Sequence, residues 1–296
     1  MIQTEVKDKL VLITGANSGI GKETARGLAA MGATIIMACR NLAKAAPVRD
    51  AIIEETGNAG VSAMHVDLAS LESIRTFARE FAVAHTCLDV LINNAGTFCP
   101  TRQETEDGFE RTMGTNHLGP FLLTHLLVPL LTQAPAARIV NVSSAAAFFG
   151  KIDLDDLQMT KSYGMAGFMA YAASKLANVL FTQELAQRLG DTRITVNAVH
   201  PGEADTNIWP DSNWFWRFAD RIRSRFRIGA EEGARTVIFA ATSASLEGIT
   251  GEFLADEQVK EVKGSCRDVA LQKALWRASE QLTGTVVSLW PTLIQA

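Results

Sequence analysis

The chain alternates short apolar runs with longer stretches in which apolar residues recur every three or four positions. Runs rich in Val, Ile and Leu are typical of buried strands, and the longer stretches have the period of amphipathic helices. Strands are expected at 9–14, 33–39, 61–68, 87–94, 137–144, 192–201 and 251–256. Helices are expected at 20–32, 42–57, 71–84 and 115–131, around 171–175, and again before 251. This alternation predicts an α/β fold, with a doubly wound parallel sheet and helices on both faces.

No linker rich in Pro, Gly or Ser interrupts this alternation, and the chain has no internal repeat, so a single domain spanning 1–296 is expected. After Pro201 the pattern changes to a stretch rich in Trp, Phe and Arg. Open α/β sheets bind ligands beyond the carboxyl ends of their strands. A substrate lid is therefore predicted at about 203–229.

Composition narrows the class of protein. With 47% hydrophobic and 20% charged residues among 296, the chain can bury a substantial core, and its net charge of -4 provides no general reason to bind nucleic acid. The four cysteines show no metal-ligand or Cys-x-x-Cys spacing, as expected of reduced thiols in a cytoplasmic protein. The longest apolar run, 121–131, is too short to span a bilayer and contains His125 and Pro129.

A glycine-rich segment, TGANSGIGKE, follows the first expected strand and opens the first expected helix. Glycines let the backbone turn tightly against a pyrophosphate, while the helix N-terminus contributes free N–H groups and a partial positive charge. The segment predicts the dinucleotide-binding turn of a Rossmann-type fold. A turn that binds nothing is the alternative, which the order of strand, turn and helix disfavours. The expected cofactor contacts are Gly15, Asn17, Ser18, Gly19, Ile20 and Gly21.

The end of the second expected strand bears on which dinucleotide binds. An acidic residue there would hydrogen-bond the ribose 2′-hydroxyl, but this chain has Cys39 followed by Arg40. A guanidinium suits a phosphate, so NADP(H) is the favoured cofactor. The alternative is that Arg40 is a solvated surface residue.

The YAASK segment places a phenol and an ammonium four residues apart. Positions i and i+4 of a helix lie on one face, so the heads of Tyr171 and Lys175 are expected to reach a common spot. On these residues alone the pair could equally be a surface contact.

Several motifs in a fixed order resemble the short-chain dehydrogenases/reductases, and the resemblance covers nearly the whole chain. They are TGANSGIG at 14–21, Asp67, NNAG at 93–96, Asn116, NVSS at 141–144, YAASK at 171–175 and HPG at 200–202. More narrowly, ACRN, IDLDDLQ, SKLANVLFTQEL and ALWRASEQLTG resemble the retinol dehydrogenase-like branch, which includes NADP-dependent enzymes acting on retinoids and lipid-derived aldehydes.

The resemblance implies roles for four catalytic residues. Tyr171 would exchange a proton with the substrate oxygen, and Lys175 would favour its phenolate and hold the nicotinamide ribose. Moving a phenol pKa from about 10 toward 7 requires about 4 kcal/mol. An ammonium about 4 Å away contributes on that order at an effective dielectric near 20. Ser144, with Ser143 as its rival, would hydrogen-bond the substrate oxygen, and Asn116 would organise a water for proton relay.

The resemblance also implies further cofactor contacts. They are Leu68; Asp67 near the adenine; Asn93, Ala95 and Gly96 at the fourth strand; Pro201, Gly202 and Thr206 at the nicotinamide amide; and Tyr171 together with Lys175. An Asp after a strand is also a common helix cap, which is the alternative for Asp67. The histidines, and the acidic group Asp153, Asp155 and Asp156, lack ligand spacing, so no metal site is expected.

Together these features predict an NADP(H)-dependent oxidoreductase that interconverts a carbonyl and an alcohol on a lipophilic substrate, retinoid-like or another hydrophobic aldehyde or ketone. Phe148, Phe149 and Phe168 are apolar pocket candidates. The alternatives are a nonenzymatic NADP(H)-sensing or scaffold protein, and a nucleotide-sugar epimerase or dehydratase.

The segment 213–227 combines aromatic residues with arginines. As an amphipathic helix it would either cover the substrate or make a peripheral contact with an anionic membrane. A homodimer through the apolar helices is a further expectation from the resemblance.

The role of Arg40 gives the first prediction. Arg40→Asp is expected to shift cofactor preference toward NADH, because a carboxylate repels the 2′-phosphate and accepts a hydrogen bond from a 2′-hydroxyl. The measurement is the ratio of NADPH to NADH efficiency in both proteins. An unchanged ratio would show that Arg40 does not choose the cofactor.

Overall fold

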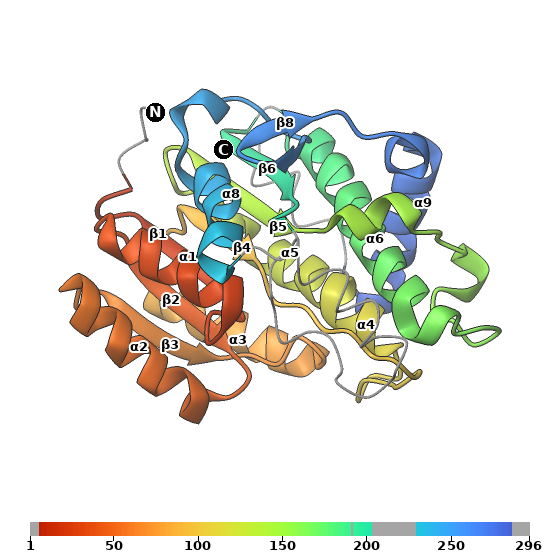
Figure 1. Ribbon diagram of the computed structural model, residues 1–296, viewed down its shortest axis with the longest axis horizontal. Coiled ribbons are helices and arrows are strands. Elements are labelled where there is room, and N and C mark those ends of the chain that lie inside the picture. The colour runs from red at the N-terminus through yellow and green to blue at the C-terminus, as the bar shows by residue number, and fades with distance from the viewer. Residues whose placement is uncertain (1–5, 191, 203–228, 286–296) are drawn as a thin grey trace.

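The computed structural model describes residues 6–190, 192–202 and 229–285 of the 296. Its strands form one eight-stranded sheet in the order β3-β2-β1-β4-β5-β6-β7-β8 (Figure 1). Pairing is parallel from β3 to β7, and β8 joins β7 antiparallel. The predicted doubly wound α/β fold is confirmed.

The elements have the following bounds. The strands are β1 (Leu10–Thr14), β2 (Thr34–Cys39), β3 (Val61–His65), β4 (Val90–Asn93), β5 (Ala137–Val142), β6 (Ile194–Val199), β7 (Phe253–Ala255) and β8 (Gln258–Lys260). The helices are α1 (Gly19–Ala30), α2 (Leu42–Thr56), α3 (Leu71–Ala84), α4 (Arg111–Met113), α5 (Gly119–Leu131), α6 (Phe168–Arg188), α8 (Ala230–Thr242) and α9 (Val269–Thr283).

The structure departs from the predicted elements in three places. The helix expected at 115–131 begins earlier, as α4, and passes through a π-helical turn at Gly114–Leu118 before α5. The edge strand β8 was not predicted, because three residues are too few to show a period. The helix α9 was likewise not predicted as an element; it packs on α6.

Helices cover both faces of the sheet (Figure 1). Apolar side chains of α3, α5, α6 and α9 form one core with the sheet, and those of α1, α2 and α8 form a second core with the other face. The strand order reverses between β1 and β4, which pair Leu12 with Leu91. In doubly wound folds the crevice at such a reversal binds the ligand.

A ladder of buried polar side chains fixes α5 and α6 against the sheet. The Asn93 amide on β4 donates to Thr124 Oγ1 at 3.0 Å and to Asn141 Oδ1 at 2.8 Å. The Asn141 amide on β5 donates in turn to Thr182 Oγ1 at 2.9 Å. Because buried polar groups are costly when unpaired, this ladder favours one placement of α6 on the sheet.

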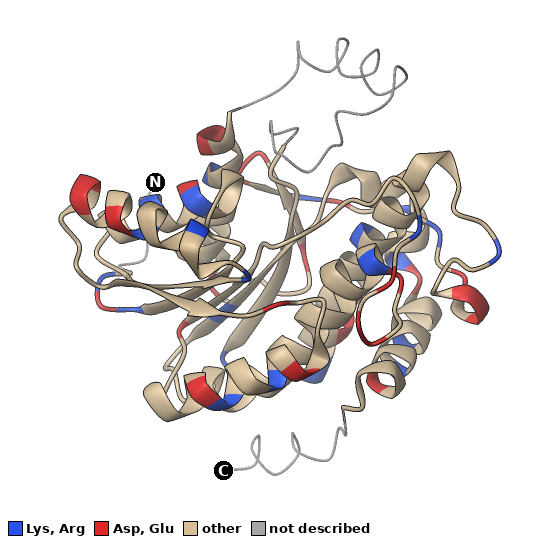
Figure 2. Cartoon of the chain, turned by 90° about the horizontal axis from the view of Figure 1, so that it is seen from below, with Lys and Arg blue, Asp and Glu red and all other residues tan. Residues whose placement is uncertain are grey.

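The surface carries charges of both signs. In the view of Figure 2, basic and acidic residues are interspersed along the helices rather than gathered by sign. Among the helices that the structure describes, none has the length and apolar character needed to cross a membrane. The cytoplasmic location and the homodimer stay predictions.

Trp276 on α9 generates a stability prediction. Its ring is 2% exposed, lies 5.0 Å from the Phe121 ring and stacks under the Arg188 guanidinium at 4.2 Å. Trp276→Ala is expected to lower the free energy of unfolding by about 3–5 kcal/mol, because it leaves a cavity between helices. Urea titration measures this. The control is Val83→Ala, since Val83 is 90% exposed, and its expected effect is below about 0.5 kcal/mol. A similar small loss for Trp276→Ala would contradict the prediction.

Candidate active site

The turn after β1 depends on glycine at three positions. Gly15 and Gly19 have φ of +68° and +52°, in the left-handed region that favours glycine. A Cβ at Gly21 would lie 2.4 Å from the Asn94 amide nitrogen and 2.6 Å from the Gly15 carbonyl oxygen. Ser18 at the N-cap of α1 makes no side-chain cap, so the first turn of α1 presents its N–H groups at the cavity. This is the geometry of an anion-binding helix N-terminus.

Thr14 joins this turn to the loop after β4. Its hydroxyl oxygen accepts from the backbone N–H groups of Asn94 and Ala95, both at 3.0 Å. The Asn94 amide donates to the Thr14 carbonyl at 2.8 Å. The two loops therefore form one rigid floor for the cavity.

The side chain of Asn93, a predicted cofactor contact, is engaged away from the cavity. Its side chain is 4% exposed and belongs to the ladder with Thr124 and Asn141, on the far side of β4 from the cavity lining. Asn94 lines the cavity in its place. Successive side chains of a strand point to opposite faces, so only one asparagine of the NNAG motif can reach the cavity.

A cavity of about 940 Å³ opens along the carboxyl ends of the strands. Most of the residues predicted to bind cofactor line it. These are Gly15, Asn17, Ser18, Gly19, Ile20, Gly21, Arg40, Asp67, Leu68, Ala95, Gly96, Tyr171, Lys175, Pro201 and Gly202. Thr206, the substrate lid at about 203–229 up to residue 228, and the segment 213–227 lie outside the described residues.

Two cavity residues bear on how the adenosine end would be held. Arg40 is exposed at the cavity and directly follows β2, as the phosphate prediction requires. Asp67 accepts from the Ala69 N–H at 2.9 Å, so it caps the turn before α3 as well as lining the cavity. Asp67 does not cap α3 itself, because the N-cap residue of that helix is Ser70, whose side chain accepts from the Ser73 N–H.

Lys175 is a buried cation on α6. Its side chain is 3% exposed, and Nζ donates to the Val142 carbonyl at the end of β5 at 2.9 Å. Burial disfavours the charged form and lowers the pKa of Lys175 to about 8. Nζ lies 5.6 Å from the centre of the Tyr171 ring. The i, i+4 pair therefore meets at the cavity, as the spacing predicted.

The two serines of the NVSS motif have different surroundings. Ser143 is 2% exposed, and its hydroxyl donates to the Lys175 carbonyl at 2.8 Å, which commits it to anchoring α6. Ser144 is half-buried at the cavity, where its hydroxyl oxygen accepts from the Ala146 N–H at 3.2 Å and its proton stays available. This geometry favours Ser144 over Ser143 as the donor to a substrate oxygen.

Asn116 lies in the π-helical turn behind the cavity. Its Oδ1 accepts from the Thr97 N–H at 2.7 Å, and its Nδ2 donates to the Thr97 carbonyl and to Ser174 Oγ at 2.9 and 3.0 Å. A Cβ added at Gly96 would lie 3.5 Å from both Asn116 Oδ1 and Lys175 Nζ. The side chain thus holds the loop after β4 against α6, beside Lys175, and its water-organising role stays a prediction.

Several residues of the cavity were not predicted from the sequence. Thr14, Asn94, Phe98, Arg111 and Thr115 line it. Asn94 could have been found from the alternation of side chains on β4. Phe98, Arg111 and Thr115 carry no local signal, because their position depends on how the segment between β4 and α5 folds back over the cavity.

The cavity fits a nicotinamide dinucleotide. The glycines leave room where any Cβ would collide, the start of α1 presents free N–H groups, and Arg40 and Lys175 supply positive charge at separate points. The turn after β1 would hold the pyrophosphate, and Lys175 the nicotinamide ribose. Such a cofactor would supply hydride chemistry at the Tyr171 end.

Comparison with known proteins agrees with this geometry. The sequence model of the short chain dehydrogenase family matches residues 9–155 and 158–214. The chain belongs to this family of oxidoreductases and, within it, to the retinol dehydrogenase-like branch. It is 42% identical to human retinol dehydrogenase 11 over 95% of this chain and 87% of the relative. It is 40% identical to mouse polyprenol dehydrogenase over 93% of this chain and 84% of the relative.

Solved structures show the same likeness. An uncharacterized protein of Mycobacterium paratuberculosis superposes with a TM-score of 0.77 and 36% identity, over 96% of both chains. A short chain dehydrogenase structure from Escherichia coli, complexed with NADPH, superposes with a TM-score of 0.66 and 27% identity, over 85% of this chain and 97% of that one.

Burial of Lys175 generates a pH prediction for the cofactor-free protein. Its pKa falls from 10.5 to about 8 on folding, so between these values the unfolded chain binds more protons and stability rises with pH. At about 1.36 kcal/mol per unit the rise is about 3 kcal/mol. Lys175→Met lacks this group, so its stability minus that of wild type should fall by about that much between pH 7 and pH 10.

Urea titrations of both proteins at the two pH values measure this difference. Lys263→Met is the matched control, because Lys263 is exposed and its substitution should shift stability equally at both values. A difference for Lys175→Met that does not change with pH would contradict the buried, proton-losing lysine.

Proposed function

We propose that the protein is an NADP(H)-dependent oxidoreductase that interconverts a carbonyl and an alcohol on a lipophilic small molecule. The observation that carries the proposal is the meeting of Ser144, Tyr171 and Lys175 at one end of a cavity whose other end has the features of a dinucleotide site. Reduction of a hydrophobic aldehyde or ketone, retinoid-like substrates included, is the reaction that this arrangement serves.

The substrate side of the cavity supports a lipophilic substrate. Phe98, Phe149 and Phe168 line it, and the Phe98 ring lies 5.9 Å from the ring of Tyr171. Phe149 is 67% exposed, so it forms an apolar rim rather than part of the core. Two relatives of this chain are named for retinol and polyprenol, both apolar alcohols.

The preference for NADP(H) is supported by Arg40, whose exposed guanidinium at the cavity suits a 2′-phosphate. One of the similar solved structures holds NADPH.

In the reduction, the chain's own residues handle the substrate oxygen and its proton. Ser144 donates a hydrogen bond to the carbonyl oxygen, and the Tyr171 hydroxyl protonates that oxygen as negative charge develops on it. Lys175, buried beside Tyr171, stabilises the phenolate that remains. The bound cofactor would supply the hydride. In alcohol oxidation the phenolate takes the proton.

The direct experiment is turnover by the purified full chain with NADPH and with NADH. The panel contains retinal, medium-chain aldehydes, steroid ketones and aromatic ketones. We expect NADPH-dependent reduction of apolar carbonyls and identify the alcohol products. NADPH binding without turnover of any compound would move the conclusion toward the nonenzymatic sensor.

Tyr171→Phe tests the proposed acid. It is expected to lower kcat at least about 100-fold, because general acid–base catalysis contributes about 100- to 10,000-fold. NADPH affinity, measured by fluorescence titration, is expected to stay within about threefold of wild type. Val83→Ala is the control for effects of expressing and purifying a variant, since Val83 is exposed and does not line the cavity. Retained activity in Tyr171→Phe would refute the role.

A further inference from the structure

A buried carboxylate begins the helix that leads to Asn116. Glu110 is 1% exposed, and its Oε1 and Oε2 accept from the N–H groups of Thr112 and Met113 at 2.8 and 2.7 Å. It therefore caps α4, which continues through the π-helical turn that carries Asn116. The next residue, Arg111, lines the catalytic cavity.

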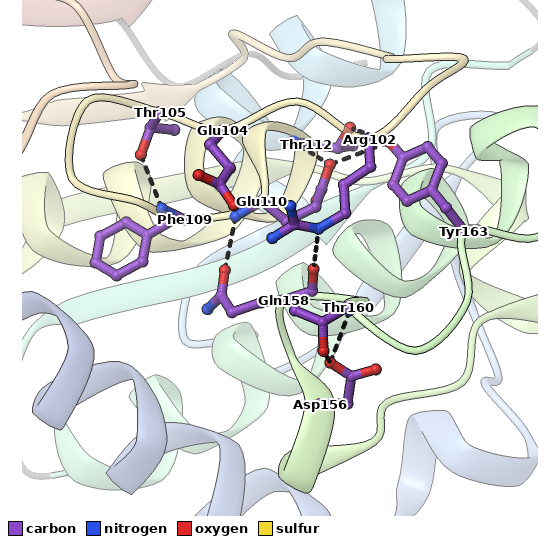
Figure 3. A network of polar contacts seen from close by, with 10 residues as sticks. All are labelled: Arg102, Glu104, Thr105, Phe109, Glu110, Thr112, Asp156, Gln158, Thr160 and Tyr163. Carbon is purple, nitrogen blue, oxygen red and sulfur yellow. Dashed lines mark hydrogen bonds and ion pairs between the residues drawn. The ribbon is translucent and has the colours of Figure 1, made fainter.

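Tyr163 brings a second segment to this carboxylate. Its hydroxyl lies 3.1 Å from Glu110 Oε1 (Figure 3). The same hydroxyl lies 2.9 Å from the Cys99 carbonyl oxygen, so one proton serves two acceptors. Thr112 Oγ1 lies 3.4 Å from the same Tyr163 hydroxyl. Burial is the largest cause that raises the pKa of Tyr163 well above its usual range, which keeps the hydroxyl protonated as a donor.

Gln158 ties the same two segments together a second time. Its side-chain Oε1 accepts from the Glu110 N–H at 2.6 Å, and its backbone carbonyl accepts from Arg102 Nε at 2.9 Å (Figure 3). The neighbouring Leu157 is buried in the core. The chain between β5 and α6 is therefore attached to the segment after β4 at several points.

The turn that follows Tyr163 has a strained backbone and lies close against the Cys99 carbonyl. Met165, Ala166 and Gly167 have φ of +52°, +48° and +84°, and the first two are not glycine. A Cβ at Gly167 would lie 1.9 Å from the Cys99 carbonyl oxygen, the same atom that Tyr163 binds. Such a conformation persists only where the surroundings hold it. This turn delivers the chain to Phe168 at the cavity.

We propose that Tyr163 is a positioning residue whose hydrogen bonds to Glu110 and Cys99 set specificity for long apolar carbonyls. We call Cys99, Glu110, Gln158 and Tyr163 the clasp. Three residues that line the cavity are direct neighbours in the chain of a clasp residue or of Gly167: Phe98, Arg111 and Phe168. The clasp holds these three in one wall. Among the described residues, no hydrogen bond joins the clasp to Ser144 or Lys175, so we expect it to act on the substrate's apolar part and not on the proton transfer.

The inference rests on the proposed function and is tested with substrates of two lengths. Tyr163→Phe removes only the hydroxyl and leaves Glu110 its two backbone donors. A hydrogen bond to a charged group accounts for about ten- to hundredfold in an equilibrium. Part of this loss weakens the wall's binding of a long substrate, so the KM for decanal is expected to rise about five- to tenfold. The kcat for decanal, both constants for propanal and the Kd for NADPH should stay within about twofold.

Two further variants separate positioning from simple loss of stability. Thr283→Val is the matched control: it also removes a buried hydroxyl bond, to the Ser279 carbonyl at 2.7 Å, on α9, which contributes nothing to the cavity lining. It should leave the decanal-to-propanal ratio unchanged. Gln158→Leu, which deprives the Glu110 N–H of its partner, should raise the KM for decanal about two- to threefold and serves if Tyr163→Phe does not fold.

Amide hydrogen exchange gives a readout independent of turnover. Residues 97–99 and 164–168 are expected to exchange about tenfold faster in Tyr163→Phe but not in Thr283→Val. An equal change in KM for decanal and propanal in Tyr163→Phe, or no change in KM for either, would overturn the inference. If wild type reduces no aldehyde at all, the proposed function fails instead, and unchanged exchange would by itself still overturn the clasp.

Discussion

The site depends on a buried cation that is held where α6 meets the end of β5. Lys175 Nζ donates to the Val142 carbonyl, and the Ser143 hydroxyl donates to the Lys175 carbonyl, so each element satisfies a buried group of the other. Keeping an ammonium there is costly, as its lowered pKa shows. The cost is tolerated because the same charge faces the Tyr171 ring and the cavity.

Close backbone packing places the cofactor site beside that cation. The turn after β1 and the loop after β4 approach until no Cβ fits at Gly21, and Thr14 and Asn94 bind the two together. Asn116 then holds Thr97 against Ser174 on α6. The turn after β1 and α6 are thus joined through one loop, whose rigidity would keep a bound hydride donor and the Tyr171 hydroxyl in a common frame.

The residues between Ser144 and Tyr171 belong to this frame as well. They cross the segment after β4 at Cys99 and Glu110 and hold a strained turn immediately before α6. The wall beside the reacting groups is therefore built from two segments far apart in the chain. In the inference drawn above, this wall selects substrate length without altering Tyr171 or Lys175.

The sequence by itself determined the strand and helix order, the glycine turn and the pairing of Tyr171 with Lys175, because periodicity, turn chemistry and i, i+4 spacing act over a few residues. Only the tertiary structure decided that Ser143 is engaged by α6 while Ser144 lines the cavity. It also assigned Tyr163, 53 positions from Glu110, to the wall. Such choices depend on register and packing between distant segments, and no local pattern encodes them.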